Sequence, residues 1–349
     1  MIENAYIKKE RMMPMHVKPK GFTYTKADLI YISHYVDGHW DEGRLESSDE
    51  LTISGLSTSL HYAQECFEGL KAYRRKDGKI QLFRVIDNAK RFQMSANYLM
   101  MPEVPIDHFI KAVKQVVKAN EAYVPDYGPK DSLYIRPFMI GVGHNLGLRP
   151  APKYMFIIVV SPVGSYFNGE AKPVDLLVSP YDRAAHKGTG HVKVGGNYAA
   201  SLHAQMRAVK AGYADCLFLD PLTHTKIEEL GAANFFGITK DNKYVTPNSP
   251  SILDSITNRS LKTLASDHLG LEVLESDIFI NDLNQFTEAG ACGTAAVITP
   301  IGSITHEGIK HTFPSSSQMG ETTKKLYDLL TGIQFGDEKD PYGWITVLD

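Results

Sequence analysis

The sequence predicts a mixed α/β protein, of the α+β kind in its first half, that folds as two domains. Its 349 residues suit two units at about 100–200 residues per domain. Runs of β-branched and aromatic residues alternate with segments of helical spacing in both halves. A stretch rich in Pro, Gly and small residues, 161–173, is the best linker candidate. We therefore expect a small N-terminal domain over 1–162, an interdomain loop over 163–173 and a larger C-terminal domain over 174–349.

Strands and helices alternate along the first half. Residues 29–36 are β-branched and aromatic and end at Asp37-Gly38, which predicts a strand entering a turn. A second Asp-Gly pair, Asp77-Gly78, predicts the turn of a hairpin. The further expected elements are a helix over 60–69 closed by glycine, the hairpin strands 70–74 and 79–83, helices over 86–100 and 106–119, and strands over 133–140 and 154–160.

The second half shows the same mixture, with apolar runs bounded by turn residues and longer segments of helical spacing. The expected strands are 174–178, 216–219 and 234–238, and the expected helices are 197–210, 258–268 and 322–330. The second half is therefore also expected to mix strands and helices.

Composition excludes several kinds of partner and site. The formal charge of −3 argues against nucleic acid or an acidic membrane as the main partner. The cysteines Cys66, Cys216 and Cys292 lie far apart, which suits a reducing compartment and argues against a thiolate metal cluster. The longest apolar run, 155–160, is too short to span a bilayer, and 1–20 has no signal-peptide core. We expect a cytoplasmic protein with no metal site.

Lys193 lies in the stretch that carries the functional prediction. It stands between Val192 and Val194 and precedes Gly195-Gly196, where the missing Cβ atoms let the backbone turn. We expect a short apolar strand to present it. A lysine in apolar surroundings loses solvation of its ammonium form, so its free amine becomes a usable nucleophile toward an aldehyde cofactor such as pyridoxal phosphate. Taken alone, the pattern is also typical of a surface lysine.

Other residues could complete a site for such a cofactor. A pyridine ring acts as an electron sink while its nitrogen stays protonated, which needs a carboxylate, and Glu229 stands at a strand entry before small residues. A phosphate needs a guanidinium or backbone N–H donors at a helix start. Asp254 and Ser255 are N-cap residue types before a predicted helix, and Arg91 and Thr294 add donors. Each is individually also typical of an ordinary surface, cap or turn residue.

Taken together, these residues resemble the branched-chain amino acid aminotransferases, which are pyridoxal-phosphate enzymes of fold type IV. The resemblance spans residues 21–344 and rests on the order and spacing of several short motifs. These motifs are Arg91, Lys193 to Tyr198, Glu229 to Phe236, Gly293 to Ala295 and, shared with the longer branch of the family, Leu60 to Tyr62, Phe67 to Ala72, Leu82 to Arg84 and Ser132 to Pro137. The resemblance implies a two-domain class IV aminotransferase fold.

The resemblance also implies a role for individual residues. Lys193 would form the Schiff base with the cofactor and then move the proton between substrate Cα and cofactor C4′, Tyr198 would hydrogen-bond the phenolic oxygen, and Glu229 would hold the ring nitrogen. The implied phosphate ligands are Arg91, Thr294 and the N–H groups of Ile256 and Thr257. The implied substrate pocket comprises Tyr62, Tyr134, Arg136, Tyr166, Ala295 and Leu253. Leu148 matches a loop residue that closes the partner subunit's pocket, which implies a homodimer.

The implied reaction is transamination between L-leucine, L-isoleucine or L-valine and 2-oxoglutarate. These three substrates differ by methyl groups, so an apolar pocket separates them only weakly. The same pocket must accept glutamate, whose distal carboxylate needs a donor such as Arg136 or a tyrosine hydroxyl. Two half-reactions that share one site give ping-pong kinetics.

The sequence leaves other enzymes of the same fold type open, and one of its motifs departs from the family pattern. Another fold type IV enzyme, a D-amino acid transaminase or an aminodeoxychorismate lyase, is the main alternative, although those relatives resemble the region 134–137 less. A non-catalytic cofactor-binding protein would not need the acid–base lysine.

The phosphate turn departs from the family's frequent pattern, with Ser255 in place of glycine and Asn258 in place of a basic residue. We expect its N–H cradle to be retained.

Overall fold

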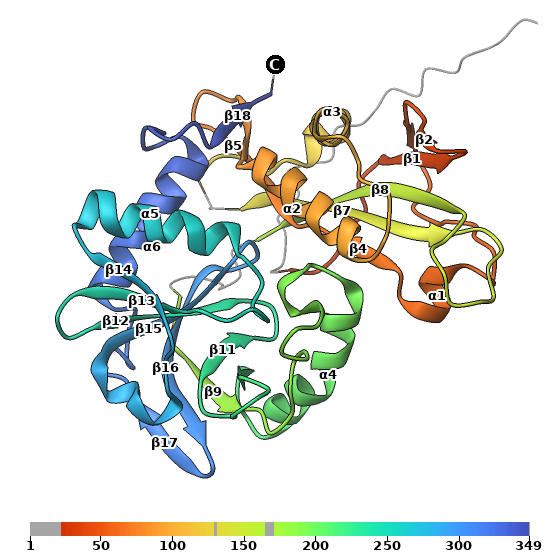
Figure 1. The fold of residues 1–349 in the computed structure, drawn as a ribbon. Coiled ribbons are helices and arrows are strands. Elements are labelled where there is room, and N and C mark those ends of the chain that lie inside the picture. The colour runs from red at the N-terminus through yellow and green to blue at the C-terminus, as the bar shows by residue number, and fades with distance from the viewer. Residues whose placement is uncertain (1–21, 129–130, 165–170, 349) are drawn as a thin grey trace, which may run out of the picture.

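The computed structural model describes residues 22–128, 131–164 and 171–348. Its strands form two sheets, which lie side by side with helices packed on them (Figure 1). The helices of the described residues are α1 (Thr58–Tyr62), α2 (Val85–Tyr98), α3 (Ile106–Ala119), α4 (Gly195–Lys210), α5 (Ile256–Leu269) and α6 (Glu321–Phe335), with short 3-10 turns η1 (Glu121–Tyr123), η2 (Thr189–His191) and η3 (Ile280–Gln285). Within the described ranges, no helix is both long and apolar enough to cross a membrane.

The first sheet is built almost entirely from the N-terminal half. Its nine described strands are β1 (Ile30–Val36), β2 (His39–Trp40), β3 (Arg44–Glu46), β4 (Glu65–Phe67), β5 (Leu70–Arg74), β6 (Ile80–Phe83), β7 (Ser132–Val142), β8 (Lys153–Val163) and β18 (Ile345–Val347). They run in the order β18-β6-β5-β7-β8-β1-β2, with β3 beside β1 and β4 beside β7. The C-terminal strand β18 thus returns to the first sheet, against β6.

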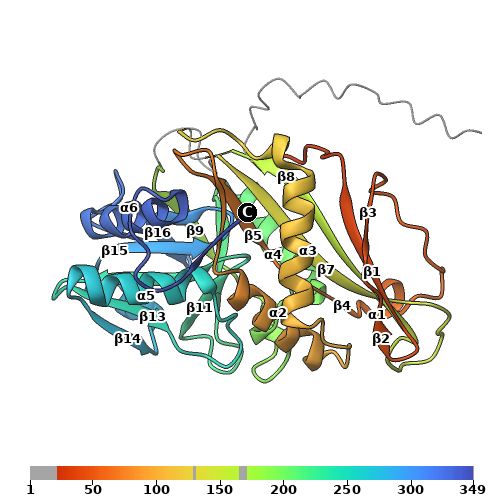
Figure 2. The same ribbon diagram turned by 90° about the horizontal axis from the view of Figure 1, so that it is seen from above.

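Helices α2 and α3 cover one face of this sheet (Figure 2). Their apolar stripes meet the strands because residues three or four apart share one face of a helix. The rings of Phe92 on α2, Phe109 on α3 and Phe156 on β8 lie 5.4–5.7 Å apart, centroid to centroid. All three side chains are fully buried, so this aromatic group is the centre of the first core.

The second sheet closes on itself. Its nine described strands are β9 (Val174–Val178), β10 (Asp215–Leu219), β11 (Ile227–Leu230), β12 (Asn234–Thr239), β13 (Lys243–Pro247), β14 (Glu272–Ser276), β15 (Phe286–Gly293), β16 (Val297–His306) and β17 (Ile309–Thr312). The order β11-β10-β9-β16-β15-β12 becomes a ring because β11 also pairs with β12. The closing pair is Glu229 with Asn234.

Helices α5 and α6 pack on the outside of the second sheet, and α6 also contacts β5 and β6 of the first (Figure 1). Leu261 and Leu264 of α5 and Leu330 of α6 belong to one buried cluster, which includes Tyr73 of β5. The side-chain amide of Gln81 donates to the carbonyls at the end of α6, 3.1 Å from Ile333 and 2.8 Å from Gln334. One core therefore joins the two sheets and fixes their relative position.

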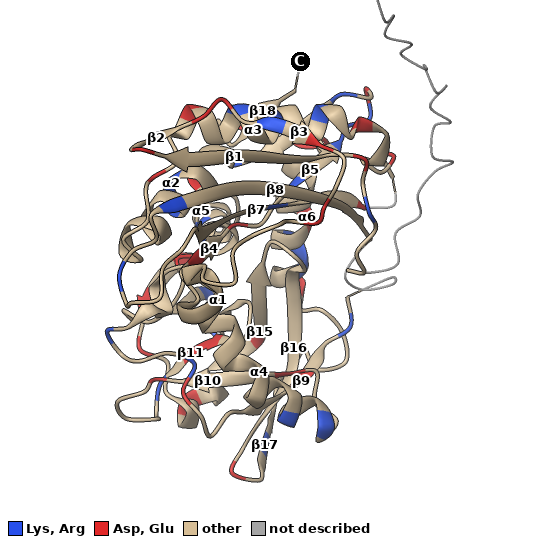
Figure 3. Ribbon diagram, turned by 90° about the vertical axis from the view of Figure 1, so that its right-hand side faces the viewer, with Lys and Arg blue, Asp and Glu red and all other residues tan. Residues whose placement is uncertain are grey.

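Charged residues are distributed without a marked concentration of one sign. In the view of Figure 3, basic and acidic residues of the described chain are interspersed along the strands and loops. The formal charge of −3 over the whole sequence agrees with this mixture. This face therefore lacks the basic stripe that is typical of nucleic-acid binding.

Most predicted elements form close to their expected bounds, including the hairpin of β5 and β6. The predicted helix over 60–69 is wrong beyond its first residues. Helix α1 ends at Tyr62, Ala63 takes a left-handed conformation with φ 50°, and Glu65–Phe67 forms β4 against β7. The pairing with β7 supplies hydrogen bonds that local helical spacing does not anticipate.

The linker candidate also begins later than its composition suggests. Strand β8 continues to Val163, and Pro162 within it pairs with Leu133. Strand β1 pairs with β8 only up to Ile158, so β8 has an open edge at Pro162, where a proline is tolerated. The predicted domain boundaries themselves stay a prediction.

Phe156→Ala tests whether the aromatic group of Phe92, Phe109 and Phe156 is the centre of the core on the first sheet. Because the ring is fully buried among other aromatic rings, we expect its removal to lower the free energy of unfolding by about 3–5 kcal/mol. Phe279→Ala, at a 41% exposed ring, should change it by less than about 1 kcal/mol. Urea denaturation of both variants measures the difference, and equal effects would place the core elsewhere.

Candidate functional site

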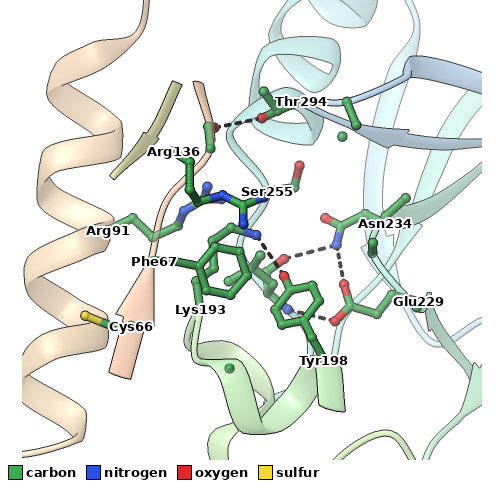
Figure 4. A pocket seen from close by; sticks show the side chains of 18 of the residues that line it. Cys66, Phe67, Arg91, Arg136, Lys193, Tyr198, Glu229, Asn234, Ser255 and Thr294 are labelled. Atoms are coloured by element: carbon green, nitrogen blue, oxygen red, sulfur yellow. Dashed lines mark hydrogen bonds between the residues drawn. The ribbon is translucent and has the colours of Figure 1, made fainter. Parts of the chain in front are cut away.

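A cavity of about 590 Å³ lies where the two sheets meet (Figure 4). One wall comes from β4 and β7 of the first sheet, and the other from β11, β12, the end of β15 and the segment just before α5. The residues predicted for the site that line it are Arg91, Tyr134, Arg136, Lys193, Tyr198, Glu229, Leu253, Thr294 and Ala295. Tertiary structure thus brings together side chains that are up to about two hundred residues apart in the sequence.

Lys193 lies immediately before helix α4 and points into the cavity (Figure 4). Its Nζ donates to the hydroxyl of Tyr198 at 2.7 Å and lies 4.6 Å from the ring centre of Phe67. Its backbone is held on both sides, since its N–H donates to Ser95 Oγ at 2.9 Å and its carbonyl accepts from the N–H of Phe67 at 3.0 Å. The backbone of Lys193 is therefore held in place, and its amine lies in a largely aromatic environment.

The expected local structure around Lys193 differs in two respects. A single bridge between Val194 and Cys66 replaces the predicted strand. Gly195 begins α4 and does not make a turn before it. A Cβ atom at Gly195 would meet the Glu65 carboxylate, so a side chain here would displace that of Glu65.

Glu229 is a buried carboxylate whose two oxygens are both bonded. Oε1 pairs with Arg183 Nη2 at 2.8 Å and accepts from the N–H of Leu253 at 3.3 Å. Oε2 accepts from Asn234 Nδ2 at 2.7 Å (Figure 4). Burial raises the pKa of Glu229 to about 7, although Arg183 and the hydrogen bonds act in the opposite direction. A second positive charge at this carboxylate would therefore favour its ionised form.

Arg91 is held by a buried ion pair at the opposite wall. Its Nε and Nη2 donate to the two oxygens of Glu68 at 2.7 and 2.9 Å. Its Nη1 donates to the carbonyl of Asp254 at 2.9 Å, which connects helix α2 to the segment before α5. Burial alone would raise the pKa of Glu68, but the adjacent guanidinium holds it below its ordinary value. The remaining N–H donors of Arg91 are therefore in a fixed place at the cavity.

The N-terminus of α5 opens beside Arg91. Ser255 is its N-cap, as predicted, and its Oγ accepts from the N–H of Asn258 at 3.2 Å. Ser255 lines the cavity, and Ile256 and Thr257 follow as the first helical residues, whose N–H groups have no acceptor within a helix. The departure at Asn258 has a structural reason, because its buried amide accepts from Tyr244 Oη at 2.7 Å and donates to Thr246 Oγ1 at 2.9 Å.

Tyr134 and Arg136 form an aromatic and cationic wall. Both lie on β7, two residues apart, so they share one face of the sheet. Arg136 Nη2 donates to Tyr134 Oη at 2.8 Å, and its guanidinium lies 4.8 Å from the ring centre of Phe67. A Cβ at Gly69 would clash with Tyr134 Oη, so this glycine makes room for the ring.

Two predicted substrate residues within the described ranges do not line this cavity. Tyr62 and Leu148 are 43% and 85% exposed and lie outside it. The hydroxyl of Tyr62 donates to the carbonyl of Leu146 at 2.7 Å, which joins α1 to the loop after β7. Tyr166 lies outside the described residues.

Sequence reasoning missed Arg183 and Glu68 as members of the site. Arg183 also donates to the carbonyls of Gly190 and Ser251, so it holds two loops beside Glu229. Glu68 was visible only as part of a short motif, and its partner Arg91 lies 23 residues away on a helix. A charged residue between apolar and small neighbours is the one signal that the sequence offers for Glu68, and Arg183 follows another charged residue and carries no such signal.

Comparisons with known proteins agree with this geometry. The family model "Amino-transferase class IV" matches residues 65–304. The Branched-chain-amino-acid aminotransferase of Haemophilus influenzae is 55% identical over 334 residues, which cover 94% of this chain and 97% of that protein. This chain belongs to the branched-chain-amino-acid aminotransferases, within class IV. The resemblance and the fold class predicted from the sequence are thus confirmed.

Solved structures of the family superpose on this aminotransferase. The T.th. branched-chain amino acid aminotransferase complexed with N-(5'-phosphopyridoxyl)-L-glutamate gives a TM-score of 0.78 at 27% identity, covering 93% of this chain and 99% of the other. The same T.th. enzyme complexed with 4-methylvaleric acid gives a TM-score of 0.77 at 26% identity, with the same coverage. The two-sheet architecture of this aminotransferase is therefore that of its family.

The buried carboxylate makes stability depend on pH in a defined direction. The folded protein holds a proton on Glu229 up to about pH 7, whereas an unfolded glutamate releases it near its ordinary value of 4.5. Unfolding free energy should therefore fall as pH rises from about 4.5 to about 7. In Glu229→Gln this part of the dependence should vanish. Melting temperatures of both cofactor-free proteins across this range measure it, and parallel curves would contradict the assignment.

Proposed function

We propose that this enzyme transfers the amino group between L-leucine, L-isoleucine or L-valine and 2-oxoglutarate, with pyridoxal 5'-phosphate bound in the cavity. The products would be branched-chain 2-oxo acids and L-glutamate, formed by ping-pong kinetics. One observation carries the proposal: an amine, a phenol and a buried carboxylate, those of Lys193, Tyr198 and Glu229, converge on one cavity. The T.th. relative complexed with N-(5'-phosphopyridoxyl)-L-glutamate supports the choice of cofactor and of glutamate.

The donor set fits this cofactor. When bound, pyridoxal phosphate supplies an aldehyde and an electron-withdrawing ring. Glu229 would hold the ring nitrogen and Tyr198 the phenolic oxygen, while Arg91, Thr294 and the start of α5 would hold the phosphate. A carboxylate whose pKa burial raises to about 7 is stabilised in its ionised form by a protonated nitrogen beside it. The ion pair with Arg183 orients the carboxylate for that contact.

Lys193 would serve as the acid–base group of the reaction. Its amine would take the proton from the substrate Cα and would deliver a proton at the cofactor C4′ in the same half-reaction. The hydrogen bond from Lys193 Nζ to Tyr198 Oη, 2.7 Å long, keeps the amine at a fixed position above the cavity wall. The rings of Phe67 and Tyr198 exclude water from one side of it.

The wall of the first sheet can accept both kinds of substrate side chain. Phe67 and Tyr134 offer apolar surface to a branched aliphatic side chain. In the described part of the chain Arg136 contacts the Tyr134 hydroxyl and the Phe67 ring, which leaves guanidinium donors for the distal carboxylate of glutamate. The T.th. complex with 4-methylvaleric acid, a branched aliphatic acid, supports the apolar part of this assignment.

We also propose a homodimer in which each copy completes the cavity of the other. Helix α1 and the loop after β7 present several exposed apolar side chains close together in the fold, namely Leu56, Leu60, Tyr62, Leu146 and Leu148. We call this group the α1 patch. Hydrogen bonds from Tyr62 Oη to Leu146 O and from Asn145 N–H to Leu56 O hold its two segments together. Exposed apolar patches of this kind are typical of protein interfaces.

A cytoplasmic location is part of the same proposal. Cys66, Cys216 and Cys292 are free and buried, which suits a reducing compartment. The partners would be amino acids and 2-oxo acids, and the cavity volume of about 590 Å³ is of the size that small ligands occupy.

An absorbance titration of the holoenzyme tests the reaction. L-leucine, L-aspartate and D-alanine are added separately without a keto acid, and loss of the yellow cofactor absorbance reports one half-reaction. We expect conversion by L-leucine only, and none in Lys193→Ala, which lacks the amine. Conversion by D-alanine would favour a D-amino acid transaminase, and a protein that binds no cofactor would contradict the proposal.

Leu148→Asp tests the dimer. A charge in the α1 patch should prevent desolvation of the interface, so the variant should elute as a monomer and lose most of its transaminase activity. Leu222→Asp, at a 66% exposed leucine outside the patch, is the matched control and should remain dimeric and active. Light scattering after gel filtration measures both. A dimeric, fully active Leu148→Asp variant would place the interface elsewhere.

A further inference from the structure

Lys71 is a buried cation that the proposed reaction does not use. It lies on β5, only 6% exposed, in the contact between the two sheets. Its Nζ donates to the carbonyl of Ala295 at 2.9 Å, across 224 residues of sequence. Burial alone lowers its pKa, to about 8, with no described acid acting on it. A buried ammonium without a counter-charge costs free energy, so a compensating role at this position is expected.

The carbonyl that Lys71 binds belongs to a turn with an unusual backbone. The turn joins β15, which ends at Gly293, to β16, which begins at Val297. Val297 has φ 61°, a left-handed conformation that is rare for a β-branched residue. Such a conformation is strained and persists only where surrounding contacts enforce it.

Two contacts to the first sheet hold this turn. Thr294 Oγ1 donates to the carbonyl of Gly69 at 3.1 Å (Figure 4), and Lys71 binds the next carbonyl, that of Ala295. Thr294 and Ala295 line the cavity, so the turn is part of its wall. Lys71 is also paired in register with Tyr134, whose side chain lines the same cavity. Lys71 thus connects the turn to the wall that faces the substrate.

We propose that Lys71 is a positioning residue that fixes the turn 293–297 against the first sheet and thereby sets the affinity for substrate. The inference rests on the proposed aminotransferase function. Lys71 lies behind the carbonyl of Ala295 and is not among the residues that line the cavity, so it acts through the turn. Its loss should let the strained turn relax and misplace Thr294 and Ala295, while the reacting groups around Lys193 stay in place.

Steady-state kinetics of the holoenzyme test this role. Lys71→Met keeps the length of the side chain but loses the donor, and its KM for L-leucine and for 2-oxoglutarate should rise about tenfold, with kcat changed less than about twofold. Lys71→Arg retains a donor that reaches the carbonyl and should recover a KM within about threefold of the unmodified enzyme. Lys79→Met, at an exposed lysine of the same hairpin, should leave both constants unchanged.

The outcomes separate this inference from the proposed function. An unmodified enzyme without activity toward L-leucine would contradict the proposed function. An active enzyme in which folded Lys71→Met keeps its KM, or in which kcat falls with KM unchanged, would overturn the positioning role alone. Lys71→Gln, whose amide is too short to reach Ala295, gives a second variant with the same expected rise in KM. If neither variant folds, Lys71 serves folding instead, and the inference is wrong.

Discussion

The buried carboxylate of Glu229 is the constraint on which the cavity depends. Removal of a carboxylate from water favours its neutral form, so the pKa of Glu229 depends on the partners that surround it. Those partners come from three segments: Arg183 before α4, Asn234 on β12 and the backbone of Leu253 before α5. Because Glu229 and Asn234 form the pair that closes the second sheet, closure of the ring and assembly of the site are the same event.

A second buried ion pair performs the equivalent task at the other wall. Glu68, between β4 and β5, accepts hydrogen bonds from Nε and Nη2 of Arg91, and Nη1 of Arg91 donates to the carbonyl of Asp254. The guanidinium and the free N-terminus of α5 are therefore set by one network. The location of an anion site is thereby determined by a pairing inside the protein, before any ligand is bound.

Because the cavity lies between two sheets, its two walls can offer different kinds of contact. The second sheet supplies the rigid charged groups around Glu229, and the first sheet supplies the aromatic and cationic wall of Phe67, Tyr134 and Arg136. Cofactor and substrate contacts can then differ in chemistry while they share one volume. The bonds of Thr294 and Lys71 across the boundary keep the two walls in register.

The sequence by itself determined the local elements and the family. The Asp77-Gly78 hairpin, the amphipathic helices α2 and α3 and the Ser255 cap follow from turn chemistry, periodicity and N-cap preference, which act over a few residues. The order and spacing of several short motifs, those around Lys193 and Glu229 among them, indicated the family. Only the tertiary structure decided that residues 65–67 form a strand, that Glu229 pairs with Arg183, and that Lys71 is buried under a turn more than two hundred residues away. These features depend on which strands become neighbours. The free energy of burying a charge, or of pairing the edge of a strand, depends on the residues that it meets there, and local sequence does not specify those residues.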